Sequence, residues 1–272
     1  MKKYLVFILC GIFLPGIAAA STTETVHLTV PFIIEIPDGT WTGPWKNACE
    51  EATMSMVDQY YQGVAKVSRQ DSKKLMLPLF AYQDSVWGSN SDSNASRTVK
   101  IIEANLDFTA TIKRYPTVEE IKNELRNSRP VISFHYAKNL KNPDHRFRVN
   151  GSYYHVMVIS GFDEAKQEFI VEDGGAENGL DYRYGYDMIM NTLADFNQVT
   201  RKTDGPPTVI FTAQNLLAKA KGSNKVYLVQ NNVKQYISHP DVFKTHGWKW
   251  SKVHIVSKEW LDSLEKGGMI TQ

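Results

Sequence analysis

Cysteine is scarce in this sequence of 272 residues, which contains only Cys10 and Cys49. Cys10 lies in the opening stretch MKKYLVFILCGIFLPGIAAA, whose basic start, short apolar run and small-residue end are typical of a bacterial secretory signal peptide. Cleavage near Ala20 would leave a single cysteine, so the mature chain could form no internal disulfide. We therefore expect a secreted, extracytoplasmic protein whose one thiol is either buried and inert or kept because it reacts.

Excess charge of one sign is also missing. The chain has 31 Lys and Arg against 29 Asp and Glu, a formal net charge of +2. Removing residues 1–20 removes Lys2 and Lys3, which leaves a neutral mature chain. A neutral chain carries no footprint for nucleic acid or for an anionic membrane, and no later segment is apolar enough to span a bilayer. We expect neither a nucleic-acid partner nor an integral membrane segment after signal cleavage.

Regular alternation of strands and helices is absent as well. Apolar periodicity predicts helices first and strands later, with a polar, irregular stretch over 64–95. This order indicates an α+β fold. The expected helices are 49–61, 96–105, a helix begun by the Thr117/Glu120 capping box, and 185–197, and the expected strands are 28–36, 131–136, 154–162, 168–175 and 207–213.

The pattern changes after Leu216, which predicts two units in the mature chain: a domain over 28–213 and a small α+β module over 222–272. Within the module we expect a hairpin turning at Asn231-Asn232 and a helix capped by Ser257 and stopped by Gly267. The module has no evident chemistry, and attachment to the cell wall or cell surface is a working interpretation.

Cys49 begins the helical pattern CEEATMSMVDQYY, with Asn47 as the expected N-cap. The unpaired N–H groups and the dipole at a helix N-terminus favour a thiolate over a thiol. A cysteine nucleophile also needs a general base, and the usual base is a histidine oriented by a third group. The position of Cys49 therefore predicts a catalytic nucleophile, with a buried structural thiol as the alternative.

His155 is the expected base, because it starts the apolar strand HVMVISGF. In an antiparallel pair the start of one strand lies beside the end of the next, so Asp173 could reach the imidazole. His135, inside another strand, is an alternative base, and Asp173 before two glycines is alternatively a turn residue. This helix-start cysteine, strand-start histidine and strand-end aspartate form the arrangement of a papain-like cysteine hydrolase.

Other candidate site residues carry weaker signals. Trp41 and Trp45 precede the cysteine and either line a substrate cleft or cap the core. The remaining notable histidines fit no tight zinc spacing, so we expect no metal and no cofactor. These histidines are His239, His246 and His254 of the small module. The tyrosines Tyr182, Tyr184 and Tyr186 are expected to pack.

Several spaced motifs also resemble the bacteriocin-processing-peptidase-like family, peptidase family C-39-like. They are VPF, W-x-x-P-W-x-N-A-C-E-E-A, PTVEEIKNEL, YYHVMVISGFD, VEDGG and YRYGYDMIMNTLADFN, in that order between residues 28 and 213. The resemblance implies a papain-like fold with Cys49 as nucleophile, His155 as general base and Asp173 as orienting residue.

One position departs from this family pattern. A glutamine that helps to bind the oxyanion usually precedes the cysteine, and Glu35 stands at the matching position. An ionised carboxylate cannot donate a hydrogen bond, and losing one such donor raises the barrier by about 3 kcal/mol. Either Glu35 is protonated, or other donors such as the Cys49 backbone N–H suffice, or catalysis is weak.

Three functions remain open from the sequence. The first is a secreted cysteine peptidase that acts on a peptide or protein. The second is a weak or inactive relative that binds peptide or cell-wall material, and the third is a thiol acyltransferase or amidase.

Overall fold

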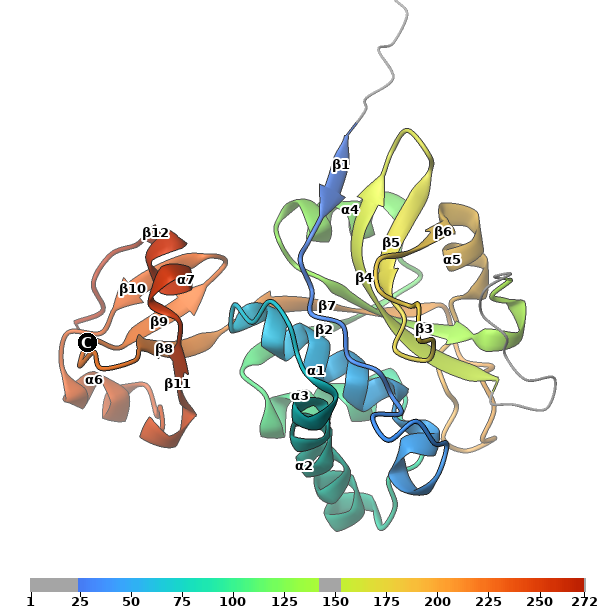
Figure 1. The fold of residues 1–272 in the computed structure, drawn as a ribbon, viewed down its shortest axis with the longest axis horizontal. Coiled ribbons are helices and arrows are strands. Elements are labelled where there is room, and N and C mark those ends of the chain that lie inside the picture. Colours follow the sequence, from blue (N-terminus) through green and yellow to red (C-terminus); the bar gives the residue numbers. More distant parts are fainter. Residues whose placement is uncertain (1–23, 142–152, 272) are drawn as a thin grey trace, which may run out of the picture.

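The computed structural model describes residues 24–141 and 153–271 (Figure 1). The predicted signal peptide, with Cys10, lies outside the described residues. Among the helices that the structure describes, none is long and apolar enough to cross a membrane.

A seven-stranded sheet forms the centre of the larger part of the chain. Its order is β2-β7-β3-β4-β5-β6, β1 pairs with β4, and every pairing is antiparallel. Every residue of β4 is buried, so the sheet is covered on both faces there. The strands are β1 (Thr25–His27), β2 (Phe108–Arg114), β3 (Val131–Tyr136), β4 (Tyr154–Asp163), β5 (Glu168–Glu172), β6 (Tyr182–Gly185) and β7 (Thr208–Gln214).

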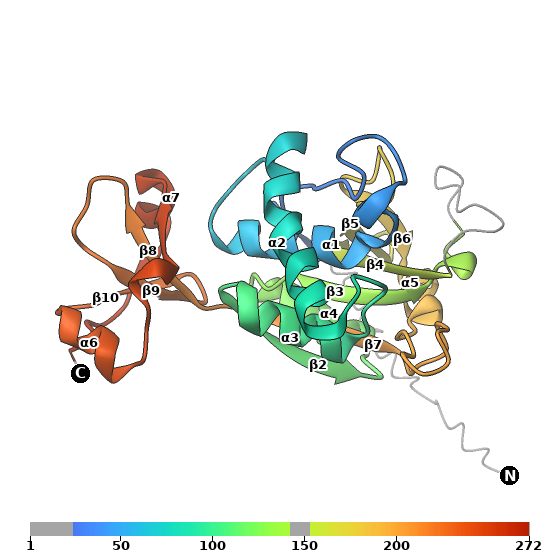
Figure 2. The same cartoon turned by 90° about the horizontal axis from the view of Figure 1, so that it is seen from below.

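Helices cover this sheet, and Figure 2 shows α1 and α2 above its strands. They are α1 (Cys49–Tyr61), α2 (Arg69–Trp87), α3 (Ala95–Asn105), α4 (Val118–Arg126) and α5 (Tyr186–Thr192), with short 3-10 helices at Gly43–Asn47 and Ala137–Asn139. The capping box of α4 is confirmed: Thr117 Oγ1 accepts from Glu120 N, and Glu120 Oε2 accepts from Thr117 N. The mixture of helices with an antiparallel sheet confirms the α+β class.

The expectation that residues 64–95 are irregular was wrong, because α2 occupies most of them. Ser68 caps the helix by accepting from Asp71 N, and Gly88 ends it in the left-handed conformation. Met76, Leu79 and Phe80 form its buried face. Leu75, Tyr82 and Trp87 also pack against the core but are only partly buried. The helical period was diluted by polar neighbours and by Pro78 inside the helix.

The N-terminal strand was also misplaced. Only Thr25–His27 forms a ladder, as β1. Residues 28–36 form no strand, although Leu28 N still donates to Ser160 O of β4. β1 lies so close to β4 that a Cβ on Gly161 would approach Val26 O to 2.3 Å, so this position requires glycine. Pro31 has no N–H to give to a ladder, which agrees with the loss of pairing after β1.

One helix boundary and one strand also differ from expectation. The helix predicted over 185–197 ends at Thr192, after which Leu193 forms a bridge with His135. The strand β2, which pairs with β7 along seven residues, was not anticipated.

A second sheet lies at one end of the molecule in Figure 1. Its order is β11-β8-β9-β10-β12, and its elements are β8 (Leu216–Ala220), β9 (Tyr227–Gln230), β10 (Val233–Tyr236), α6 (Pro240–Thr245), a 3-10 helix at Trp250–Lys252, β11 (Val253–Val256), α7 (Lys258–Ser263) and β12 (Glu265–Lys266). Asn231 and Asn232 have positive φ between β9 and β10, as the hairpin prediction required. Helix α7 is shorter than expected, because Glu265–Lys266 pairs with β10 instead of continuing to Gly267. The division into units 28–213 and 222–272 stays a prediction.

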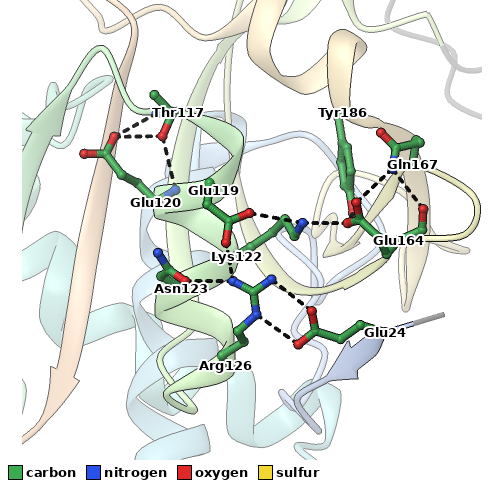
Figure 3. A network of polar contacts seen from close by, with 10 residues as sticks. All are labelled: Glu24, Thr117, Glu119, Glu120, Lys122, Asn123, Arg126, Glu164, Gln167 and Tyr186. Atoms are coloured by element: carbon green, nitrogen blue, oxygen red, sulfur yellow. Dashed lines mark hydrogen bonds and ion pairs between the residues drawn. The ribbon is translucent and has the colours of Figure 1, made fainter. Parts of the chain in front are cut away.

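Ionic contacts on α4 fix the N-terminal segment to the sheet (Figure 3). Arg126 binds both carboxylate oxygens of Glu24 at 2.9 Å. Lys122, whose side chain is only 8% exposed, binds Glu164 at 2.6 Å in the turn after β4. Because Glu24 directly precedes β1, this network helps to position the chain that leads to Glu35.

Candidate active site

Cys49 is the first residue of α1, and only 5% of it is exposed. Its Sγ donates a hydrogen bond to Glu50 Oε2 at 3.0 Å. The N-cap is Ala48 instead of the expected Asn47, and no side chain caps this end. The sequence thus placed the thiol correctly at the helix start, while the 3-10 helix before it displaced the cap by one residue.

His155 and Asp173 meet as the antiparallel pairing predicted. His155 lies at the start of β4, Asp173 directly follows β5, and His155 Nε2 is 2.7 Å from Asp173 Oδ1. The aspartate is itself held in place, since Gly175 N donates to Oδ1 at 3.1 Å and Tyr184 Oη donates to Oδ2 at 3.4 Å. Asp173 therefore makes the alternative turn contact and the histidine contact together.

Glu35 completes the cluster from the extended segment after β1. Its backbone N–H donates to Gly174 O at 3.0 Å, and its Oε1 lies 3.6 Å from His155 Nδ1. One side-chain ligand atom from each of Glu35, Cys49 and His155 lies within 4.8 Å of the other two. Four predicted site residues from separate parts of the chain are thus brought together, since Asp173 contacts the same imidazole.

The two strand histidines differ sharply in their surroundings. Burial lowers the pKa of His155, but the charge and hydrogen bond of Asp173 and the charge of Glu35 outweigh it and raise that pKa to about 9. His135 lies opposite on β3, bonded to Thr192 Oγ1 at 2.9 Å and Ser133 Oγ at 2.8 Å. Burial, with the charge of His155, lowers the pKa of His135 to about 3. His155 shares the cluster with Cys49 and has the Asp173 carboxylate behind it, whereas the ring nitrogens of His135 contact hydroxyl groups, which favours His155 as the base.

The thiol does not show the lowered pKa expected from its helix position. Burial, followed by the charges of Glu50 and Glu35, raises the pKa of Cys49 well above its usual value. Burial likewise raises the pKa of Glu35 to about 7. Desolvation and neighbouring carboxylates outweigh the partial charge at the helix N-terminus, which is worth only about 0.3–1 kcal/mol at exposed positions.

The model of the Peptidase_C39 like family, the C39-like peptidases, matches residues 27–203 of this chain. The matched range is more than half of the chain and contains all four residues of the cluster. The chain belongs to this family. Membership of the C39-like family indicates a cysteine peptidase.

Further comparisons give little more. No curated protein matches the sequence. Among solved structures, one described as a C39-like peptidase from Bacillus anthracis matches at 16% identity and a TM-score of 0.44, covering 69% of this chain and 97% of the other.

Two further glutamates of this C39-like chain are buried in the first turn of α1, and the sequence did not reveal that Glu50 accepts the hydrogen bond of the thiol. Glu50 accepts from Ser93 N, and Glu51 accepts from Gln83 Nε2. Both glutamates are 1% exposed. Burial, and then the charge of Glu51, raises the pKa of Glu50 well above its usual value. Their first-turn position was predicted, but their partners come from α2 and the loop after it, a region expected to be irregular.

The tryptophans lie in unlike places. Trp45 is buried in the core, packs edge-on against Phe80 at 5.7 Å and donates to Asp38 Oδ2 at 3.1 Å. Trp41 is 40% exposed. Trp45 therefore caps the core, while Trp41 is the one with surface available to a ligand.

Two glycines form the wall behind the cluster. A Cβ on Gly175 would lie 3.0 Å from His155 Cε1 and 3.3 Å from Glu35 Oε1. A Cβ on Gly174 would lie 2.8 Å from Ile33 O. The pair of glycines after Asp173 thus allows the segment of Glu35 to approach the imidazole closely.

Proposed function

We propose that this chain is a secreted cysteine peptidase with a papain-like domain, in which Cys49 is the nucleophile, His155 the general base and Asp173 its orienting partner. The observation that carries the proposal is the convergence of these three side chains from the start of α1, the start of β4 and the end of β5. Membership of the C39-like peptidase family supports the same reaction class.

The geometry suggests a role for each group. The nitrogen of His155 that faces Glu35 and Cys49 is Nδ1, because Nε2 is bonded to Asp173. In the neutral form of the ring, whose fraction grows as the pH rises toward the raised pKa of about 9, Nδ1 would take the thiol proton as Sγ attacks the substrate carbonyl, and would return it to the leaving amine. Asp173 holds the ring with Nε2 protonated and stabilises the imidazolium that forms. Water then hydrolyses the acyl-enzyme.

The oxyanion would be bound by backbone N–H groups at the start of α1, that of Cys49 first. The thiol at rest points to Glu50 at 3.0 Å, so the attack requires it to turn toward His155.

A peptide library digested by the purified chain tests the proposal, with cleavage products identified by mass spectrometry. We expect cleavage that disappears in Cys49→Ala and falls by at least about a hundredfold in His155→Ala. His239→Ala is the control, because this histidine lies on α6's N-terminal side, is largely exposed and bonds only locally to Asp241 in the contacts described. No cleavage by folded wild-type protein, or equal cleavage by Cys49→Ala, would refute the proposal.

A second candidate is a catalytically weak relative that binds peptide or cell-wall material. Glu35 at the oxyanion position and the contact of the thiol with Glu50 favour it. Under this alternative, Cys49→Ala would bind peptides as the wild type does, and Glu35→Gln would create cleavage that the wild type lacks.

Adding a primary amine to the digestion separates hydrolysis from acyl transfer, since an acyltransferase would give amide products. Surface attachment through the segment after residue 222 is part of the same proposal.

A further inference from the structure

The cluster formed by Glu35, Cys49 and His155 contains the three kinds of donor atom that zinc prefers in proteins. Glu35 offers a carboxylate oxygen, Cys49 a sulfur and His155 an imidazole nitrogen, all within 4.8 Å of one another. Bonds of roughly 2.0–2.3 Å in a tetrahedron hold ligand atoms roughly 3.3–3.6 Å apart. The Oε1–Nδ1 distance of 3.6 Å already has this value, and the sulfur lies within 4.8 Å of the ligand atoms of both residues.

An independent observation concerns Glu35 Oε1. The residue is 3% exposed, and among the residues that the structure describes no hydrogen-bond donor satisfies this oxygen. A buried carboxylate oxygen without a donor is costly, and native proteins satisfy such atoms with hydrogen bonds or with a cation. Oε1 also faces Nδ1, so the atom that needs a partner points into the cluster.

The surroundings are those of a metal ligand set. Histidines that bind metal through one ring nitrogen usually give the other N–H to a carboxylate, as His155 Nε2 does with Asp173 at 2.7 Å. Asp173 is fixed in turn by Gly175 N, and Glu35 by its backbone bond to Gly174. Buried Glu50, in contact with Sγ, adds a further acidic group next to the site.

We propose that Glu35 Oε1, Cys49 Sγ and His155 Nδ1 bind one Zn²⁺ ion, with water in the fourth position. Binding displaces the thiol proton to solvent, together with any proton on His155 Nδ1 and on the Glu35 carboxyl, so that sulfur coordinates as thiolate, nitrogen as neutral imidazole and oxygen as carboxylate. The ion occupies both the proposed nucleophile and the proposed base, so it inhibits the peptidase reversibly. This inhibitory consequence rests on the proposed function, whereas the binding itself does not.

Binding is tested on the full purified chain after treatment with EDTA. Calorimetry with Zn²⁺ should give one site per chain, and Co²⁺ should give the absorption band of a thiolate–cobalt bond. Losing a side chain that hydrogen-bonds a metal ligand costs about ten- to a hundredfold in metal affinity, and losing the ligand itself costs at least as much. We therefore expect Glu35→Gln to weaken zinc binding at least about tenfold, and Cys49→Ala to abolish the cobalt band.

Protection of the thiol gives a second readout that needs no turnover. Saturating Zn²⁺ should block alkylation of Cys49 by iodoacetamide, and the block should require a higher zinc concentration in Glu35→Gln. His239→Ala is the matched control and should bind zinc as the wild type does, with circular dichroism confirming that each variant folds.

The outcomes separate the two proposals. Zinc affinity that is unchanged in folded Glu35→Gln and Cys49→Ala would overturn the site. Cleavage that persists at saturating zinc, or that needs zinc, would overturn the inhibitory assignment. Tight zinc binding that depends on these ligands, by a chain that cleaves no peptide, would refute the proposed function and leave the metal site standing.

Discussion

Replacing Asp173 with asparagine tests whether its carboxylate sets the protonation of His155. Asparagine keeps the shape of the side chain and removes the charge that lies 2.7 Å from Nε2. We expect the pKa of His155 to fall from about 9 toward that of a buried imidazole with neutral partners.

His135 provides the scale for this change within the same protein. It is buried like His155, lies opposite it on the neighbouring strand and, within residues 24–141 and 153–271, makes its ring hydrogen bonds to hydroxyl groups, and its pKa is about 3. In Asp173→Asn, His155 Nδ1 still lies 3.6 Å from the Glu35 carboxyl, so the pKa of His155 should stay above that of His135. We expect a fall of at least about two pKa units, which corresponds to about 3 kcal/mol less stabilisation of the imidazolium.

The effect on stability has a defined direction with pH. The pKa of His155 in the folded protein, about 9, lies above its unfolded value near 6.5. The contribution of this group is therefore complete below pH ~6.5 and is lost as the pH rises through 9. Asp173→Asn should lower the free energy of unfolding most at pH ~6 and least near pH ~9.5, with a difference of about 3 kcal/mol.

The assay combines NMR titration of the histidine ring signals, in EDTA, with urea unfolding at both pH values. Asp241→Asn is the control, because Asp241 lies 3.1 Å from His239 at the surface, where the side chains of both residues are more than 60% exposed. That exposed pair should contribute less than about 1 kcal/mol. An unchanged pKa of His155 in Asp173→Asn, or equal losses of stability at the two pH values, would refute the reasoning.

Three other changes have outcomes fixed by the structure. Gly174→Ala places a Cβ 2.8 Å from a backbone oxygen and should destabilise the protein by about 1–3 kcal/mol in urea unfolding, whereas Gly268→Ala, with no atom within 4 Å, should not. Lys122→Met removes the buried ammonium that pairs with Glu119 and Glu164, and should lower the free energy of unfolding by about 2 kcal/mol. Because a buried pair is screened little, high salt should lower the stability of the wild type by much less than this substitution does. Burial raises the pKa of Asp58 from 3.8 to about 6, so folding stability should fall by about 3 kcal/mol as the pH rises through this window, and Asp58→Asn should remove that slope in a pH series of unfolding measurements.

Local signals in the sequence were sufficient for most elements of the fold. The capping box at Thr117 and Glu120 and the asparagine pair at the hairpin describe contacts within a few residues, and both are found as expected. Helix α2 was missed because its core face consists of few apolar residues and its polar face dominates the composition. Its helical state depends on burial against α1, which a local pattern does not contain.

Some residues of the candidate site could likewise be predicted from the sequence, and others could not. Cys49 at a helix start and His155 at a strand start could be read from periodicity, and Asp173 followed from the antiparallel pairing of neighbouring strands. Tyr184 behind Asp173 had no signal, because its hydroxyl reaches the carboxylate only through the pairing of β5 and β6.

The sequence by itself determined the family, the α+β class and the positions of Cys49, His155 and Asp173, because spacing and short-range chemistry encode them. Only the tertiary structure decided the electrostatics. Burial of the thiol, followed by the charges of Glu50 and Glu35, reverses the pKa shift that the helix position favours, since desolvation and the charge of neighbours depend on distances in space. The buried position of Glu35 beside Cys49 and His155 is likewise the basis of the zinc site that we propose, and spacing along the sequence does not contain it.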